Sequence, residues 1–288
     1  MTWTTTRDPE AFDAAAGGFL RARPVDHTVL LSVAAALRAS GADRYGDEPP
    51  RYGWWWRPGG GVGGAFLWTP PRPVLLSPMP DGAAAALADA LTRERCRVPG
   101  VNAGRSVAES FAAAWRRQHG GTAHPARHHR LYRLGALCPP DPAPPGTARW
   151  ARPADRELLV SWFADFAAAI GGPPPRNTRP VDDRIAGGRC LLWEDGGRPV
   201  AMASRTATVS GATRIAPVYT PPGLRGRGYA GAVTAALSQR ARDAGVGTVL
   251  LFTDLANPTS NALYRRLGYR PVHDHLVLEF GGAGPGAG

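Results

Sequence analysis

Apolar residues recur along the second half of the chain at spacings that predict a regular order of strands and helices. A short β-type run at 147–151 precedes a stretch, 155–170, whose apolar residues have helical spacing. A second, shorter helix is expected at 181–185. Strands at 190–193 and 200–209 flank the turn residues Glu194-Asp195-Gly196-Gly197, which predicts a β-hairpin. The inward face of the first helix would carry Leu158, Leu159, Trp162, Phe163 and Phe166.

The pattern continues with a strand at 213–220, a helix at 231–244 that Gly245 ends, and a buried strand at 248–252. Pro217 cannot donate to a strand ladder, so it predicts a bulge or a splayed edge in the first of these strands. A further helix begins at Asn257, and a last strand ends near Phe280. Together these elements predict an α+β fold with a mixed sheet.

The first half of the chain has a similar order of patterns. Strands are expected at 52–57, 65–69 and 73–77, a helix at 82–95, an extended piece at 98–102, a helix at 105–119 and a strand at 129–137. Residues 138–146 form a proline-rich connector that continues neither helix nor sheet. We therefore expect an N-terminal domain at 1–137, a linker at 138–146 and a second domain at 147–282.

Two features of the first half bear on its role. The strand residues Trp54-Trp55-Trp56 alternate in direction, so Trp54 and Trp56 would share one face, and core packing is a simpler role for them than a substrate wall. The segment 77–82 has Pro78 and Pro80 where phosphate-binding amides would be needed, and Asp81 would repel phosphate. The first half is then either a degenerate copy of the second or an unrelated accessory domain that lines an acceptor pocket.

A loop with glycines at 226, 228 and 231 lies between a predicted strand and a predicted helix. Backbone amides at a helix N-terminus favour anions, so this loop is suited to a pyrophosphate. The segment 226–231 also satisfies the dinucleotide fingerprint, with Asp254 as the ribose ligand. A doubly wound fold would need further βα units after this one, and residues 220–225 separate the strand from the glycines, so we favour the pyrophosphate loop of another fold.

The helix after residue 256 has a polar face. Asn257 suits the N-cap and Pro258 the first helical position. Asn257, Asn261 and Tyr264 lie at i, i+4 and i+7 and so share one side of the helix. A capped surface helix would explain Asn257 but not Tyr264.

These residues resemble the GNAT superfamily of acyl-CoA-dependent N-acetyltransferases, whose pyrophosphate signature is Arg or Gln, two residues, Gly, one residue, and Gly or Ala. Arg225, Gly228 and Ala230 fill it. The resemblance implies that acetyl-CoA is the co-substrate, that the bulged strand pairs with the pantetheine arm, and that Tyr264 protonates the departing thiolate. The implied cofactor-binding residues are Val218, Tyr219, Thr220, Arg225, Gly226, Arg227, Gly228, Tyr229, Ala230, Gly231, Asn257, Asn261 and Tyr264.

Acyl transfer to an amine also needs a general base, and the strand 213–220 contains no carboxylate. Asp254 is the first candidate for this catalytic role; His273, Asp274 and His275 on the last strand are others. Asp254 could instead form a turn, and the histidines could lie on a solvated strand face. A water relay, or an amine that arrives partly deprotonated, would serve as well.

Composition limits the remaining choices. The net charge is +11, and all of the basic side chains apart from histidine are arginine. We find no basic run interleaved with aromatics, no apolar run of about 18 residues and no signal peptide, so neither nucleic acid nor a membrane is an expected partner. The three cysteines are widely spaced, so no disulfide framework and no metal site is expected.

The sequence thus predicts a cytoplasmic acetyl-CoA-dependent N-acetyltransferase that acts on a small-molecule or peptide amine, and it leaves open whether the protein is a monomer or a homodimer. The arginines near the loop favour a neutral or acidic acceptor over a polycation. The alternative from another class is a module that senses acyl-CoA without turnover. Tyr264 separates the two, because a sensor needs the phosphate loop but no acid.

Overall fold

The computed structural model describes residues 2–172 and 174–281, which form two compact units. Among the described residues, unit 1 contains 2–130, Asp254–Ala256 and 273–281. Unit 2 contains Leu131–Thr253 and Asn257–Val272. The domain borders expected at residues 137, 146 and 282 stay a prediction, and residue 282 lies outside the described residues.

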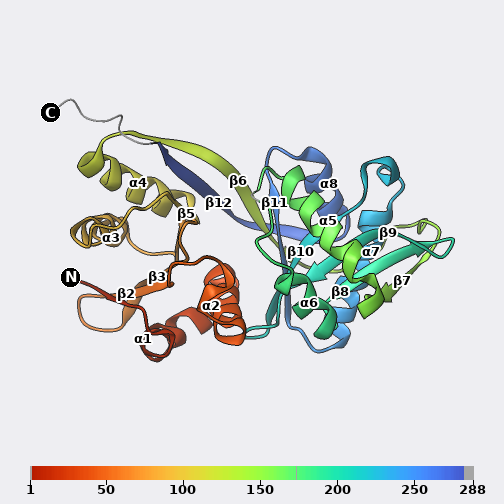
Figure 1. The fold of residues 1–288 in the computed structure, drawn as a ribbon, viewed down its shortest axis with the longest axis horizontal. Helices are drawn as coiled ribbons and strands as arrows, with labels where there is room; N and C mark the ends of the chain where they lie inside the picture. Colours follow the sequence, from red (N-terminus) through yellow and green to blue (C-terminus); the bar gives the residue numbers. More distant parts are fainter. Residues whose placement is uncertain (1, 173, 282–288) are drawn as a thin grey trace. The chain divides into compact units, whose positions relative to one another are not determined.

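The first half of the chain runs through one strand, two helices, three strands and then helix, strand, helix, strand (Figure 1). These elements are β1 (Trp3–Thr6), α1 (Pro9–Arg21), α2 (Thr28–Ser40), the 3₁₀ turn η1 (Ala42–Arg44), β2 (Arg51–Trp56), β3 (Val62–Trp68), β4 (Val74–Leu76), α3 (Asp81–Arg93), β5 (Gly100–Gly104), α4 (Arg105–His119) and β6 (Thr122–Leu134).

The second half repeats this order. Its elements are β7 (Thr147–Trp150), η2 (Pro153–Asp155), α5 (Arg156–Ala169), α6 (Arg179–Ala186), β8 (Cys190–Asp195), β9 (Arg198–Arg205), β10 (Ala212–Tyr219), η3 (Pro222–Leu224), α7 (Tyr229–Asp243), β11 (Thr248–Asp254), α8 (Pro258–Arg266) and β12 (Tyr269–Gly281).

Strand pairing repeats as well. The first four strands of each half pair antiparallel in succession, β1 to β4 and β7 to β10. The fourth strand of each half then pairs parallel with the fifth, β4 with β5 and β10 with β11. The predicted α+β fold with a mixed sheet is therefore confirmed, and the two halves share one topology.

The last strand of each half is long and contributes to both units. Residues 275–279 of β12 pair antiparallel with β5 in unit 1, where Leu276 and Leu278 join the core. In unit 2, β6 lies beside β11, and its residues Tyr132 and Leu134 join the core. Each unit is therefore completed by the final strand of the other half of the chain.

Helices α1 and α2 were not predicted from the sequence. The start of α1 carries clear local signals, because Asp8 accepts a hydrogen bond from the Glu10 amide at 2.8 Å and Pro9 occupies the first helical position. Both helices bury apolar side chains, including Phe12, Leu20 and Leu31. Their presence makes the repeat of element order complete.

The three tryptophans of β2 differ in burial. Trp54 and Trp55 are buried, which agrees with core packing, but Trp56 is 43% exposed. The register shifts between Trp55 and Trp56, where Gly63 is an extra residue on β3, and the expectation that Trp54 and Trp56 share a face stays a prediction.

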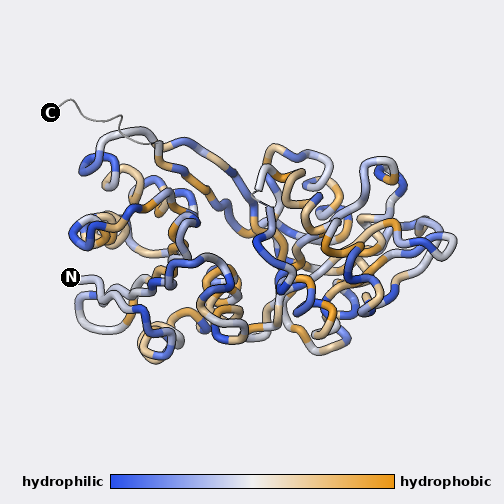
Figure 2. The backbone as a smooth tube through the Cα atoms, viewed as in Figure 1, coloured by the Kyte–Doolittle hydropathy of each residue, from blue (hydrophilic) through white to orange (hydrophobic). Residues whose placement is uncertain are grey.

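Unit 2 has two layers of side chains on its sheet. Leu192 and Met202 pack with α5 and α6, whereas Leu191 and Ala203 pack with α7 and α8, because neighbouring strand residues point to opposite faces. Hydrophobic segments lie within these strands and helices, and the turn between β8 and β9 is hydrophilic (Figure 2). The site described below lies where this sheet opens.

Candidate functional site

Strand β10 separates from its parallel neighbour before either strand ends. The pairing with β11 runs from Ala212 opposite Thr248 to Ile215 opposite Leu251. On the other edge, the register with β9 shifts between Ile215 and Val218, which confirms the bulge predicted from Pro217. The last residues of β10 thus lie at an opening in the sheet.

The loop after β10 turns into α7 with left-handed glycines. Gly226 has φ +78° and Gly228 has φ +83°, which side chains rarely tolerate. The Ala232 amide donates to the Gly228 carbonyl at 3.1 Å and so makes the first bond of α7. The amides of residues 229–231 therefore have no partner within the helix and are available to an anion.

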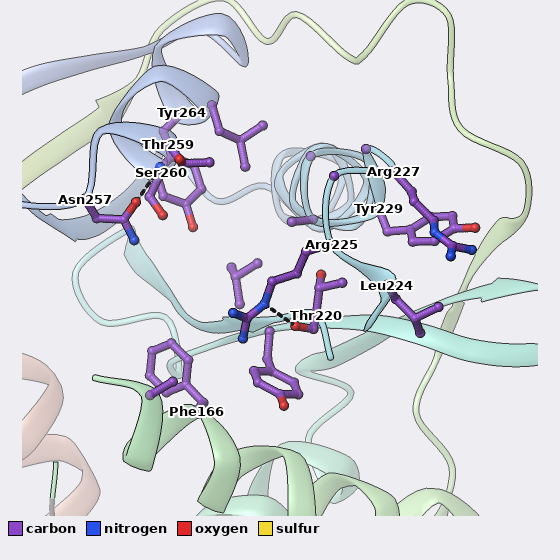
Figure 3. Close-up of a pocket in the computed structure, with 18 of the residues that line it drawn as sticks. Phe166, Thr220, Leu224, Arg225, Arg227, Tyr229, Asn257, Thr259, Ser260 and Tyr264 are labelled. Carbon is purple, nitrogen blue, oxygen red and sulfur yellow. Dashed lines mark hydrogen bonds between the residues drawn. The ribbon is translucent and has the colours of Figure 1, made fainter. Parts of the chain in front are cut away.

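These elements surround a cavity of about 660 Å³ (Figure 3). Every cofactor-binding residue predicted from the sequence lines it except Asn261. The walls come from α5, the end of β10, the loop before α7 and helix α8. The lining residues are Phe166, Ala169, Ile170, Val218, Tyr219, Thr220, Leu224 to Gly231, Asn257, Thr259, Ser260, Leu263, Tyr264 and Arg266.

The charge of the lining is positive. Arg225, Arg227 and Arg266 line the cavity. Within the part of the chain that the structure describes, no acidic residue lines it. The Arg225 Nε donates to the Thr220 carbonyl at 3.1 Å, so this side chain extends along the cavity, whereas Arg227 lies beside Tyr229 across α7 (Figure 3). The buried Thr220 Oγ1 has no hydrogen-bond partner among the residues that the structure describes.

Tyr264 lies on α8 with its phenol in the wall of the cavity. Burial raises the pKa of Tyr264 to about 12, because the phenolate would lose its hydration. Its ring meets that of Tyr269 edge-on at 6.0 Å between centroids. The phenol is therefore held in place and protonated near neutral pH.

The two asparagines of α8 have different surroundings. The Asn257 Oδ1 caps the helix by accepting from the Ser260 amide at 3.0 Å, and Asn257 also lines the cavity. The Asn261 Nδ2 donates to the Asn257 carbonyl at 2.7 Å, and its Oδ1 accepts from the Tyr132 hydroxyl at 3.0 Å. In this structure Asn261 thus orders its own helix, and the expected contact with the CoA arm stays a prediction.

None of the candidate bases named from the sequence lines the cavity. Asp254 is exposed and accepts from the Ala256 amide at 2.8 Å, as a turn residue does. Asp274 makes two hydrogen bonds with Arg130, at 2.6 and 2.9 Å. The Nε2 atoms of His273 and His275 lie 2.9 Å apart.

Sequence reasoning missed two carboxylates that hydrogen-bond tyrosines of the lining. The Tyr219 hydroxyl donates to Asp165 Oδ2 at 3.3 Å, and the Tyr229 hydroxyl donates to Asp195. Asp165 is on α5 and Asp195 ends β8, so neither belongs to a motif near the loop. Only the hydrogen bonds that they make in the folded structure identify Asp165 and Asp195.

The proline-rich connector packs on the start of α7. A Cβ atom at Gly228 would lie 3.5 Å from Pro144, and one at Gly231 would lie 3.4 Å from Pro140. The Trp193 indole donates to the Pro145 carbonyl at 2.9 Å. Part of the connector is therefore anchored within unit 2.

The acetyltransferase (GNAT) family model matches residues 156–269, which contain every residue that lines this cavity and both motifs. The match covers less than half of the chain, and within it the sequence is similar to the GNAT family. No curated protein matches the chain in sequence.

Solved structures resemble nearly the whole chain. A GNAT-family acetyltransferase from Colwellia psychrerythraea is 13% identical with a TM-score of 0.61, covering 98% of this chain and 100% of its own. A GCN5-related N-acetyltransferase from Sphaerobacter thermophilus is 20% identical with a TM-score of 0.62, covering 98% and 97%. A Drosophila protein is 14% identical with a TM-score of 0.67, covering 97% and 98%. Both halves therefore have the arrangement seen in these folds.

Across residues 2–172 and 174–281, no helix combines the length and apolar character that a membrane span requires.

Proposed function

We propose that the protein is an acetyl-CoA-dependent N-acetyltransferase that acts on a primary amine. One observation carries the proposal: a cationic cavity joins helix-terminal amides, a buried phenol and the opened end of a sheet. The amides suit a diphosphate, the phenol suits a leaving thiolate, and the opening lets an amine meet a thioester. A non-catalytic acyl-CoA sensor, which is the alternative, would need only the helix-terminal amides.

The residues present fit acetyl-CoA. The amides of 229–231 and the left-handed glycines before them would hold the diphosphate, with Arg225 and Arg266 supplying positive charge. The main chain of Val218 and Thr220 would pair with the amide-rich arm beyond the bulge. The buried, unpartnered Thr220 Oγ1 supports a polar ligand at this point.

Acetyl-CoA supplies an acetyl group already activated as a thioester. The acceptor amine attacks the carbonyl carbon, the carbon–sulfur bond breaks, and a main-chain N–H near 218–220 stabilises charge on the carbonyl oxygen. Tyr264 would give its proton to the departing sulfur, and its high pKa keeps that proton available at neutral pH. The amine proton would leave through water or a carboxylate such as Asp254 or Asp165.

The direct test measures acetyl-CoA binding by calorimetry, together with CoA thiol release when amines from a cell extract are added. We expect one acetyl-CoA per chain, because the counterpart of the loop in the first half has Pro78, Pro80 and Asp81 in place of glycines. Mass spectrometry should find an acetylated amine. Binding without any acetylated product would favour the sensor, and absence of binding would refute both readings.

A further inference from the structure

The wall that α5 contributes to the cavity is apolar. Phe166 and Ala169 on this helix and Ile170 at its C-cap lie at i, i+3 and i+4, and all three line the cavity. Ile170 is 48% exposed, which makes it one of three large exposed apolar side chains within the described residues, with Trp56 and Val272. Together with Phe166 and Ala169, Ile170 gives the cavity an apolar surface that a ligand can cover.

This apolar wall and the amide-rich wall lie on opposite faces of the sheet in unit 2. Tyr219 packs with α5 among Trp162 and its neighbours, whereas Val218 packs with α7 and α8. Both residues line the cavity, so the cavity continues past the end of β10 from one face to the other. A diphosphate ligand at α7 leaves the α5 end to a second substrate.

The charges at the cavity discriminate between kinds of amine. Its lining contains three arginines and, among the described residues, no carboxylate. Two acidic side chains hydrogen-bond tyrosines of the lining, Asp165 with Tyr219 at the α5 end and Asp195 with Tyr229 at the loop. A polycation would meet repulsion that one carboxylate cannot offset, whereas a single ammonium group can approach Asp165.

We infer that the acceptor is a small monoamine with an apolar aliphatic or aromatic body, which packs on Phe166 and Ile170 with its amine toward the opening beside β10. This inference rests on the proposed acetyl transfer. In the reaction a nitrogen–carbon bond forms and the carbon–sulfur bond of the thioester breaks. The amine loses one proton and the thiol gains one.

The experiment compares primary amines in a CoA thiol-release assay with mass-spectrometric detection of the product. 2-Phenylethylamine and hexylamine should each have kcat/KM at least about 10-fold above ethanolamine and spermidine, the scale of apolar discrimination in a pocket. Ile170→Ser should reduce this preference several-fold without changing acetyl-CoA affinity. Val272→Ser is the matched control, since Val272 is 41% exposed and does not line the cavity.

The possible outcomes distinguish a failure of the inference about the acceptor from a failure of the proposed acetyl transfer. If acetyl-CoA binds and spermidine or ethanolamine is acetylated as well as the apolar amines, the inference about the acceptor is overturned and acetyl transfer stands. If longer acyl-CoA esters are preferred and the choice of amine makes no difference, the apolar wall holds the acyl chain and the inference is again wrong. If no acetyl-CoA binds, the proposed function fails and the inference fails with it.

Discussion

The Tyr132 hydroxyl donates a hydrogen bond to Oδ1 of Asn261 across 3.0 Å, and both side chains are buried in unit 2. Tyr132 belongs to β6, the last strand of the first half, and Asn261 to α8 of the second half. One turn further along α8 lies Tyr264, the proposed acid. The first half of the chain thus contributes directly to the order of the candidate catalytic helix.

Tyr132→Phe should lower the free energy of unfolding by about 1 kcal/mol, because a buried hydrogen bond is lost while the ring stays. Urea denaturation followed by tryptophan fluorescence measures the change. The substitution should also lower turnover more than acetyl-CoA affinity, since it loosens the helix that carries Tyr264. A variant with wild-type stability would show that this hydrogen bond does not hold α8.

Gly228→Asp should abolish acetyl-CoA binding, because side chains rarely adopt the φ of +83° found here and a carboxylate would repel the diphosphate. Gly223→Asp is the matched control. It adds the same charge in the same loop, where a Cβ would have no neighbour within 4 Å and φ is not positive. Calorimetry on folded variants should show a much smaller loss of affinity for the control; equal losses would point to charge alone.

Tyr264→Phe should lower turnover roughly 10²-fold with little change in acetyl-CoA affinity, as expected for the loss of one general acid. Because the pKa of Tyr264 is raised to about 12, its protonated form persists, and Tyr264 should cause no fall in kcat between pH 7 and about 9.5. Tyr269→Phe serves as control. The Tyr269 hydroxyl makes a hydrogen bond of 2.7 Å with the Ser238 hydroxyl, and neither residue lines the cavity. The Tyr269→Phe variant should therefore lose stability but keep its turnover.

Cleavage of the connector between residues 139 and 146 should not release a separate C-terminal domain. Unit 2 requires Tyr132 and Leu134, and unit 1 requires Leu276 and Leu278, so each fragment supplies core residues to both units. Size-exclusion chromatography of the nicked protein should give one peak in buffer and two in urea. Two peaks in buffer, with a folded fragment from 147 onward, would contradict the exchange of strands.

Acid should weaken unit 2 through Asp155. Arg149 makes two hydrogen bonds to this carboxylate, at 2.6 and 2.8 Å, and holds the pKa of Asp155 below its ordinary value of 3.8. The stabilisation is complete above about pH 4 and is lost as pH falls through the lowered folded-state pKa. Asp155→Asn should cost roughly 2 kcal/mol at pH 6, a difference that shrinks toward pH 2 in urea denaturation. A difference independent of pH would rule out the charge of Asp155 as its source.

The elements around the loop could be predicted because their signals are local. The glycines at 226 and 228, the ring of Pro217 and the N-cap Asn257 each act on the backbone within a few residues. They placed the bulge, the starts of α7 and α8 and the residues of the anion end of the cavity. The signals at Asp8 and Pro9 were equally local, so α1 could also have been found from the sequence.

The sequence by itself determined where the chain turns, bulges and begins its helices, because these depend on the conformational preferences of single residues. Only the tertiary structure decided that β6 and β12 complete each other's units, that Asn261 bonds Tyr132, and that Asp165 reaches Tyr219 from α5. Asp165 and Tyr219 are 54 positions apart in the sequence, and Tyr132 and Asn261 are 129 positions apart. Burial and strand pairing between distant segments select them, and no local pattern of side chains records that choice.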